Sequence, residues 1–414
     1  MNARLGNLFK GDKVIWMVFL FLCIISVIEV FSASSTLTYK SQNYLSPLIY
    51  HSGMIFFGLF VAIVVLNVPC RYFKIMTPLL LFITYATLLW VLVGGESING
   101  ANRVIRIASF TFQPSEIAKG TMVLATAQIL SAMQRSDGSG ADEKTLKYVA
   151  FIVTPALFLI GIENLSTACL LFLVIFLMLF IGRIPMKQIS KIMAAGVLAV
   201  GVFLALVLTL GSLEDGEDEK NPPSSAVVND SRNEIKGGGV FHRFATWRNR
   251  IVKHSGGDVE AKDYDIDKNF QVGHANIAIA SSNIVGKGPG NSTERDYLPQ
   301  AFSDFIYAII IEEMGIVGAI AVVFLYVILL FRSARIAGAC ENNFPAFLVM
   351  GLALLLVIQA CINMMVAVGL MPVTGQPLPL ISKGGTSTII NCAYIGVILS
   401  VSRSAKRTES VTTK

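Results

Sequence analysis

The chain has 414 residues, of which 54% are hydrophobic and only 14% are charged, and its mean hydropathy is +0.65. Soluble domains carry about 25% charged residues, so this composition argues against a soluble globular protein, a disordered chain and a basic nucleic-acid binder. The formal net charge is +6, but its distribution along a membrane chain matters more than its sum. The six cysteines show no C-x-x-C spacing, which argues against a zinc site, and a disulfide framework is not expected.

Ten apolar stretches dominate the sequence. An apolar stretch of about 18 residues or more is long enough to cross the hydrocarbon core of a bilayer. We therefore predict an all-α polytopic membrane protein, with ten transmembrane helices in a single domain over residues 1–414. The predicted spans are 14–34, 46–67, 75–94, 115–134, 148–163, 166–182, 192–213, 303–331, 344–370 and 386–402. The first is expected to be retained rather than cleaved as a signal peptide, because it is long and other spans follow it.

The distribution of Lys and Arg predicts the orientation. With the N-terminus inside, most basic residues of the short loops fall on the cytoplasmic side, as the positive-inside rule requires. Both termini are then cytoplasmic, including a short tail at 403–414. The long polar segment 214–302, between the seventh and eighth spans, becomes an extracytoplasmic loop, and its second half is expected to fold back onto the bundle.

Ionisable residues inside a membrane are costly and are functional candidates by default. Glu116 and Lys119 are three residues apart near the start of the fourth span, so they share a helix face. They follow Gln113-Pro114, and a proline suits the first helical position. The alternative to a functional role is an intrahelical ion pair behind a capping segment.

Asp304 opens the eighth span, where the long loop meets the membrane surface. A carboxylate placed there would face both a lipid head group and water. The alternative is a helix N-terminal acid favoured by the macrodipole, with Ser303 as the helix cap. Glu312 and Glu313 lie deeper, and for them packing, hydrogen bonding or pairing with a basic residue is the favoured role.

Three further groups carry polar chemistry. The segment 371–387 contains three prolines and several glycines, which predicts a rigid turn that dips back toward the bundle. Its Lys383 with the following glycines suits either a phosphate site or a structural hairpin. Arg243 and Arg248 flank Trp247 in the long loop and suit either an anionic head group or solvent. For His51 and Glu29, an internal hydrogen-bonded pair or a polar anchor is favoured.

Four motifs occur in order along the chain and together resemble the SEDS family (shape, elongation, division and sporulation), which includes FtsW and RodA. The ten-span layout and the long outer loop strengthen the resemblance. The motifs are Asn99-Gly100-Ala101 with Arg103; Gln113-Pro114-Ser115-Glu116 with Lys119; Leu298-Pro299-Gln300 with Ser303-Asp304-Phe305-Ile306 and Glu312-Glu313-Met314-Gly315; and Pro377-Leu378-Pro379-Leu380-Ile381-Ser382 with Gly384-Gly385-Thr386-Ser387, although the family often has a tyrosine where this chain has Lys383.

The resemblance implies a peptidoglycan glycosyltransferase of the cytoplasmic (inner) membrane that polymerises lipid II on its outer face. Asp304 matches the proposed catalytic aspartate of the family. The expected substrate-binding residues are Glu116, Lys119, Arg103, Arg243, Arg248, Gln113, Ser303, Ser382 and Lys383. The expected partners are lipid II, the nascent glycan strand, a class B penicillin-binding protein and other division proteins of the membrane. No cofactor is indicated, although the chemistry leaves room for a divalent cation, Mg or Mn.

Other functions remain open at this point. An FtsW-like role in septal wall synthesis is favoured over a RodA-like role in elongation, on the resemblance alone. A flippase or transporter of lipid-linked precursors would also use intramembrane charges, but such proteins place their key groups near the midplane. A scaffold for a wall-synthesis complex is a third reading, compatible with catalysis by the same chain.

Overall fold

The computed structural model describes residues 10–34, 46–98, 101–107, 110–136, 140–196, 270–298 and 301–412, together with 198, 201–202, 205 and 207. The chain forms two compact units. The larger unit comprises Met1–Pro185, Phe270–Leu370 and Thr374–Lys414, and it holds every element named below. The smaller unit comprises Met186–Asn269 and Met371–Val373, and its residues 186–196 are helical.

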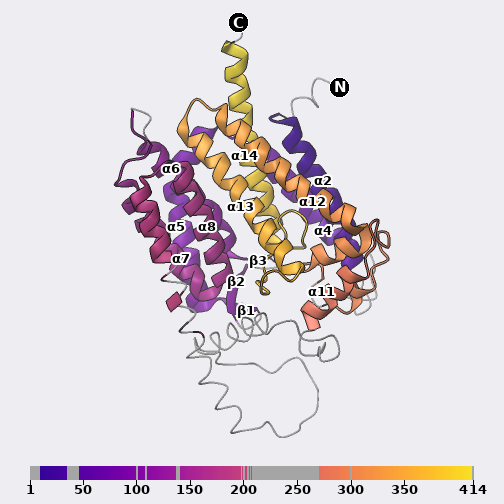
Figure 1. Cartoon of the computed structure of the whole chain (residues 1–414). Coiled ribbons are helices and arrows are strands. Elements are labelled where there is room, and N and C mark those ends of the chain that lie inside the picture. Colours follow the sequence, from indigo (N-terminus) through magenta and orange to yellow (C-terminus); the bar gives the residue numbers. More distant parts are fainter. Residues whose placement is uncertain are drawn as a thin grey trace, which may run out of the picture. The chain divides into compact units, whose positions relative to one another are not determined.

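Long helices make up most of the larger unit (Figure 1). α13 packs against α12, α6 and α8, and α4 packs along α14. In chain order the helices are α2 (Lys13–Ala33), α4 (Ser46–Asn67), α5 (Cys70–Gly94), α6 (Pro114–Ala132), α7 (Thr145–Glu163), α8 (Leu165–Ile181), α11 (Phe270–Ala280), the short η1 (Glu294–Asp296), α12 (Ile306–Gly338), α13 (Asn343–Ala367) and α14 (Thr386–Thr412).

The apolar stretches of the sequence correspond closely to these helices. Within the described residues, seven helices are long and apolar enough to cross a membrane, and α8 is a shorter apolar helix. α6 is less apolar because serine, threonine, glycine and two charged residues occur in it. The predicted span 192–213 lies largely outside the described residues. A helical, multi-pass architecture is therefore confirmed, whereas the count of ten stays a prediction.

A small antiparallel sheet between α5 and α6 departs from the expected all-α architecture. Its strands are β1 (Glu96–Ile98), β2 (Ala101–Ile107) and β3 (Phe110–Phe112), in the order β1-β2-β3. β2 pairs with β3 so that Ile105 lies opposite Phe112. The β-branched residues of β2 favour a strand. The sheet was not predicted because its three strands are too short to form an apolar run of membrane-spanning length.

Asp12 ties three helices together at one end of the unit. Its carboxylate caps α2 by accepting from Val14 N at 2.9 Å, and it forms an ion pair with Arg332 of α12 at 2.7 Å. Its backbone N–H donates to Ser402 Oγ of α14 at 2.8 Å. Figure 1 shows the start of α2 and the last turns of α14 at this same end, with the sheet and α11 at the opposite one.

Candidate functional site

Asp304 lies in a turn of residues 301–305 that leads into α12. Phe305 and Ile306 behind it are buried, whereas Asp304 itself is only half-buried. Ser303 Oγ donates to Asp304 Oδ1 at 3.0 Å. The alternative in which Ser303 caps the helix is wrong, because α12 begins at Ile306, with Phe305 at the cap position and no side-chain cap bond. Substrate binding by Ser303 stays a prediction.

The segment 374–385, between α13 and α14, is largely buried within the larger unit, in agreement with the turn toward the bundle that its prolines and glycines predicted. Gln376, Leu378, Leu380, Ile381 and Ser382 are all at most 3% exposed. The loop touches the Asp304 turn directly, since a Cβ added at Gly375 would lie 3.6 Å from Asp304 Oδ2. Asp304 therefore lies where two separate segments of the chain meet.

Backbone hydrogen bonds fasten this loop to the Asp304 turn. Ser382 Oγ donates to Ser303 O at 2.6 Å and accepts from Leu378 N at 2.7 Å. The backbone N–H of Lys383 donates to Phe302 O at 2.9 Å. The Ser382 hydroxyl, predicted to bind substrate, is thus engaged by the protein's own backbone in this structure.

Lys383 places a cation over the Phe302 ring, which belongs to the Asp304 turn. Its Nζ lies 4.9 Å from the centre of the Phe302 ring, a cation–π contact two residues from Asp304. The side chain is half-buried, and this burial lowers the pKa of Lys383 below its ordinary value. A desolvated ammonium is a suitable partner for a phosphate group.

Glu116 and Lys119 form the predicted intrahelical ion pair. Lys119 Nζ lies 2.8 Å from Glu116 Oε1, and the two side chains are only 0% and 2% exposed. Lys119 also donates to Gln359 Oε1 at 2.7 Å, and Ser387 Oγ donates to Glu116 Oε2 at 3.1 Å. Pro114 occupies the first helical position of α6, as expected. Substrate contact by this enclosed pair stays a prediction.

Two amides of α13 that the sequence analysis passed over complete the site. Gln359 and Asn363 are each 1% exposed. Gln359 Nε2 donates to Pro377 O at 3.0 Å. Asn363 Nδ2 donates to Gln376 O at 2.7 Å and to the backbone carbonyl of Asp304 at 2.9 Å. The sequence did offer a signal for these two residues, because they are polar amides one helical turn apart within an apolar span.

The remaining predicted residues are less fully placed. Gln113 is half-buried directly before α6, and Arg103 belongs to β2, although its side chain is outside the described part of the structure. Arg243 and Arg248 lie outside the described residues.

His51 Nε2 is 2.8 Å from Ser26 Oγ, so its partner is a serine rather than Glu29. Both oxygens of Glu29 are buried, with no hydrogen-bond partner among the described residues.

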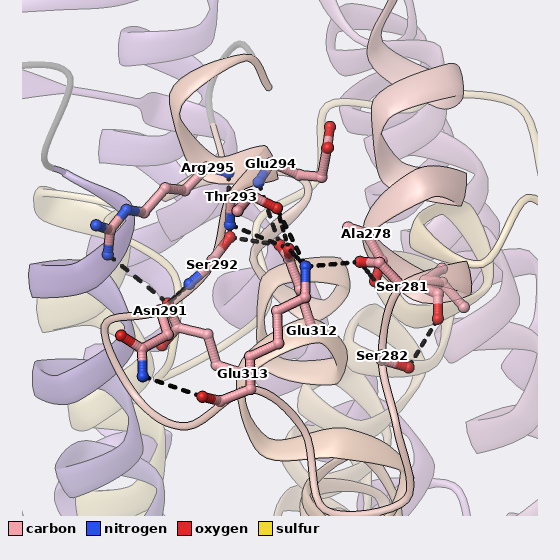
Figure 2. Close-up of polar contacts among 12 residues, drawn as sticks. Ala278, Ser281, Ser282, Asn291, Ser292, Thr293, Glu294, Arg295, Glu312 and Glu313 are labelled. Carbon is pink, nitrogen blue, oxygen red and sulfur yellow. Dashed lines mark hydrogen bonds and ion pairs between the residues drawn. The ribbon is translucent and has the colours of Figure 1, made fainter.

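Glu312 and Glu313 of α12 fasten the loop that precedes the Asp304 turn, and Figure 2 shows the contacts between Glu312 and Thr293 of that loop. Glu312 accepts from Lys287 Nζ at 2.6 Å and from Thr293 N at 3.0 Å. Glu313 accepts from Gly290 N at 2.9 Å. Both carboxylates are fully buried, so the predicted pairing with a basic residue is confirmed for Glu312. The loop before the turn is thereby fastened to the helix after it.

The described residues contain no group of three or more His, Cys, Asp or Glu side chains placed to hold a metal ion. The polar groups of the Asp304 turn and its contacts are the Asp304 carboxylate, the Ser303 hydroxyl, the buried amide of Asn363 and the Lys383 ammonium over the Phe302 ring. This set suits proton transfer next to an anionic group.

The fold and the polar groups around Asp304 define a class of protein. It is a polytopic helical membrane protein with a polar site where the turn before α12 meets the loop between α13 and α14. The family model described as "Cell cycle protein" (FTSW_RODA_SPOVE) matches residues 12–407. The chain therefore belongs to this family, which is the SEDS family that its motifs resemble.

Curated relatives and solved structures agree with this assignment. "Probable peptidoglycan glycosyltransferase FtsW" of Geobacter sp. (strain M18) is 28% identical over 94% of this chain and 96% of the relative. The protein of the same name from Buchnera aphidicola is 28% identical over 97% and 96%. Among solved structures, a chain of a peptidoglycan synthase complex superposes with a TM-score of 0.67 at 23% identity, covering 96% of this chain and 99% of that one. Thermus thermophilus Rod shape determining protein RodA gives 0.63 at 22% identity, over 96% and 98%.

Proposed function

We propose that this chain is a peptidoglycan glycosyltransferase that polymerises lipid II into glycan strands on the outer face of the cytoplasmic membrane. The observation that carries the proposal is the half-buried carboxylate of Asp304, in a turn that the loop of residues 374–385 contacts and that carries the ammonium of Lys383 over its Phe302 ring. The family and the names of the full-length relatives support it. Because those relatives are named FtsW, septal synthesis during cell division is the proposed role, with RodA-like elongation as the alternative.

Asp304 is proposed as the general base. The 4-hydroxyl of the acceptor sugar loses its proton to the carboxylate as it attacks the anomeric carbon of the donor. The bond from that carbon to the lipid pyrophosphate breaks, so direct displacement inverts the anomeric centre. Ser303 Oγ donates to Oδ1 of Asp304 and is proposed to orient the carboxylate toward the acceptor hydroxyl.

The leaving group is a pyrophosphate, which needs positive charge rather than a proton. Lys383 is proposed to supply that charge, together with Arg103 and the loop arginines Arg243 and Arg248. The enclosed Glu116–Lys119 pair fits better as a support for the site than as a direct contact. Asp304 is the carboxylate proposed to bind a divalent cation, should the reaction use one.

The proposed setting is a multi-pass protein with both termini in the cytoplasm and the site outside. A class B penicillin-binding protein is the proposed partner, since the similar solved chain comes from a complex that couples polymerization and crosslinking. The positive-inside distribution of basic residues supports this orientation. A polymerase and its crosslinking partner must work on the same side of the membrane.

The test is polymerisation of labelled lipid II by purified protein, with and without a class B penicillin-binding protein. Asp304→Ala and Asp304→Asn are expected to lower the rate by about 10²–10⁴-fold, the usual loss for a general base, while the folded yield stays unchanged. Glu341→Gln, a carboxylate exposed between α12 and α13, is the control. Wild-type activity in a folded Asp304→Ala protein would remove the base, and inactivity of wild-type protein would favour transport or scaffolding.

A further inference from the structure

Gln359 and Asn363 lie four residues apart on α13, so they share one face of that helix. Each is 1% exposed, and neither side chain is positioned to meet a substrate from solvent. Burying an amide side chain in an apolar helix is costly unless its polar atoms form hydrogen bonds. The partners that they find are all backbone or side-chain groups of the candidate site.

Asn363 joins the Asp304 turn to the re-entrant loop. Its amide nitrogen donates one hydrogen bond to Asp304 O at 2.9 Å and another to Gln376 O at 2.7 Å. The two N–H groups of one amide are thus divided between two segments more than seventy residues apart in sequence. The amide orientation is determined by this contact, because the flipped amide would place its oxygen against two carbonyl oxygens.

Gln359 connects the same loop to the buried ion pair of α6. Its Nε2 donates to Pro377 O at 3.0 Å, and its Oε1 accepts from Lys119 Nζ at 2.7 Å. Lys119 is paired with Glu116, which accepts from Ser387 Oγ at the start of α14. The ion pair therefore holds the loop near both of its ends, once through Gln359 and once through Ser387.

We propose that Gln359 and Asn363 are positioning residues that hold the loop of residues 374–385 and the backbone of Asp304 in the geometry that proton transfer requires. This inference rests on the proposed function. With its main chain fixed by Asn363, Asp304 retains only its two side-chain torsions, and Ser303 Oγ restrains those. A displacement of about 1 Å at a reacting group can cost about 10²-fold in rate.

The experiment compares kcat and KM for lipid II in Asn363→Leu, Gln359→Glu and Gln359→Met. Leucine keeps the approximate size of asparagine and removes both hydrogen bonds. Glutamate keeps an acceptor for Lys119 but places an oxygen against Pro377 O, whereas methionine removes both contacts. Asn343→Leu, the same substitution at an exposed position of α13, is the matched control.

All three variants are expected to lower kcat by about 10- to 100-fold with KM changed by less than about 2-fold, and the control is expected to match the wild type. A raised KM with unchanged kcat would make these residues substrate ligands and overturn the proposal. Wild-type kcat in folded variants would overturn it as well. Wild-type kcat in Gln359→Glu with a loss in Gln359→Met would assign the effect to Lys119 and not to the loop.

Hydrogen exchange separates this inference from the proposed function. The backbone N–H groups of Ser382 and Lys383 donate to Leu378 O and Phe302 O, so they report whether the loop is fastened. Faster exchange of these amides in Asn363→Leu, but not in Asn343→Leu, is expected whatever reaction the protein catalyses. If wild-type protein polymerises nothing, the proposed function fails while this measurement still decides the positioning role. Unchanged exchange would contradict it.

Discussion

Glu312 is a fully buried carboxylate in a helix long and apolar enough to span a membrane. A lone charge there would be very costly, but both oxygens of Glu312 are hydrogen-bonded. Thr293 donates from its backbone and its hydroxyl, at 3.0 and 2.9 Å, and Lys287 supplies the opposite charge. The carboxylate therefore acts as a fixed anchor for the loop that precedes the Asp304 turn.

Glu312→Gln is expected to destabilise the protein by about 3 kcal/mol or more, as removal of one partner from a buried ion pair does. The amide offers one acceptor oxygen in place of two and leaves Lys287 without its counter-charge. Thermal unfolding in detergent measures the effect, and Glu341→Gln provides the exposed control. An unchanged melting temperature would show that the hydrogen bonds to Glu312 contribute little.

At the scale of elements, α12 is interrupted at Gly315, where φ is 67° and ψ is −170°. That conformation is almost restricted to glycine. A Cβ at Gly315 would lie 2.4 Å from Ile284 O, and one at Gly286 would lie 2.3 Å from Glu313 O. The two glycines let the loop before α12 pack directly against the helix backbone.

Gly315→Ala is therefore expected to lower stability by more than about 2 kcal/mol, from backbone strain and from overlap with a carbonyl that cannot move easily. Gly338→Ala in the same helix is the matched control, because its Cβ would meet nothing within 4 Å. That substitution is expected to be neutral or to stabilise by up to about 1 kcal/mol. Equal melting temperatures for the two variants would contradict the close packing at Gly315.

The start of α2 gives a prediction about pH. Burial alone would raise the pKa of Asp12, but hydrogen bonds from Arg332 and from the backbone of Ile15 and Val14, with the Arg332 charge, hold that pKa below its usual range. A lowered pKa in the folded state means that this contribution to stability is present above the unfolded pKa, about 3.9. It is lost as the pH falls through the folded pKa.

Asp12→Asn keeps the helix cap but removes the ion pair, so it is expected to melt below wild type at pH 7. The difference should close as the pH falls below about 4, because protonated Asp12 then resembles asparagine. Asp12→Ala also loses the cap and should cost about 1 kcal/mol more. Melting curves of the three proteins between pH 3 and 7 test this, and a pH-independent difference would contradict it.

At the scale of the whole molecule, helix positions followed closely from the sequence because a bilayer demands long apolar runs. Asp304 and the Glu116–Lys119 pair could be singled out because charged residues are rare in apolar runs. Gln359 and Asn363 were missed because uncharged amides are less unusual there. Their hydrogen-bond partners also depend on the path of the loop after α13, and the prolines of that loop predict a turn but not its position. The alternative that made Ser303 a helix cap fails because α12 starts at Ile306, three residues later than the predicted span.

The predicted topology is testable on a single helix. Tyr297 is exposed before α12 and Glu341 is exposed after it, so Y297C and E341C, each in a cysteine-free background, lie on opposite sides if α12 spans the membrane. A membrane-impermeant thiol reagent is expected to label Y297C in intact cells or spheroplasts and to label E341C only after permeabilisation. The reverse pattern would invert the proposed orientation, and labelling of both would remove the span.

The contacts of Asp12 have a consequence for how the protein is made. Asp12 leaves the ribosome long before its partners, because Arg332 follows 320 positions later and Ser402 follows 390 positions later. α2 is therefore made long before its own N-terminal end can form these contacts. The contact with Ser402 must wait for α14, so nascent chains that end before α14 lack it.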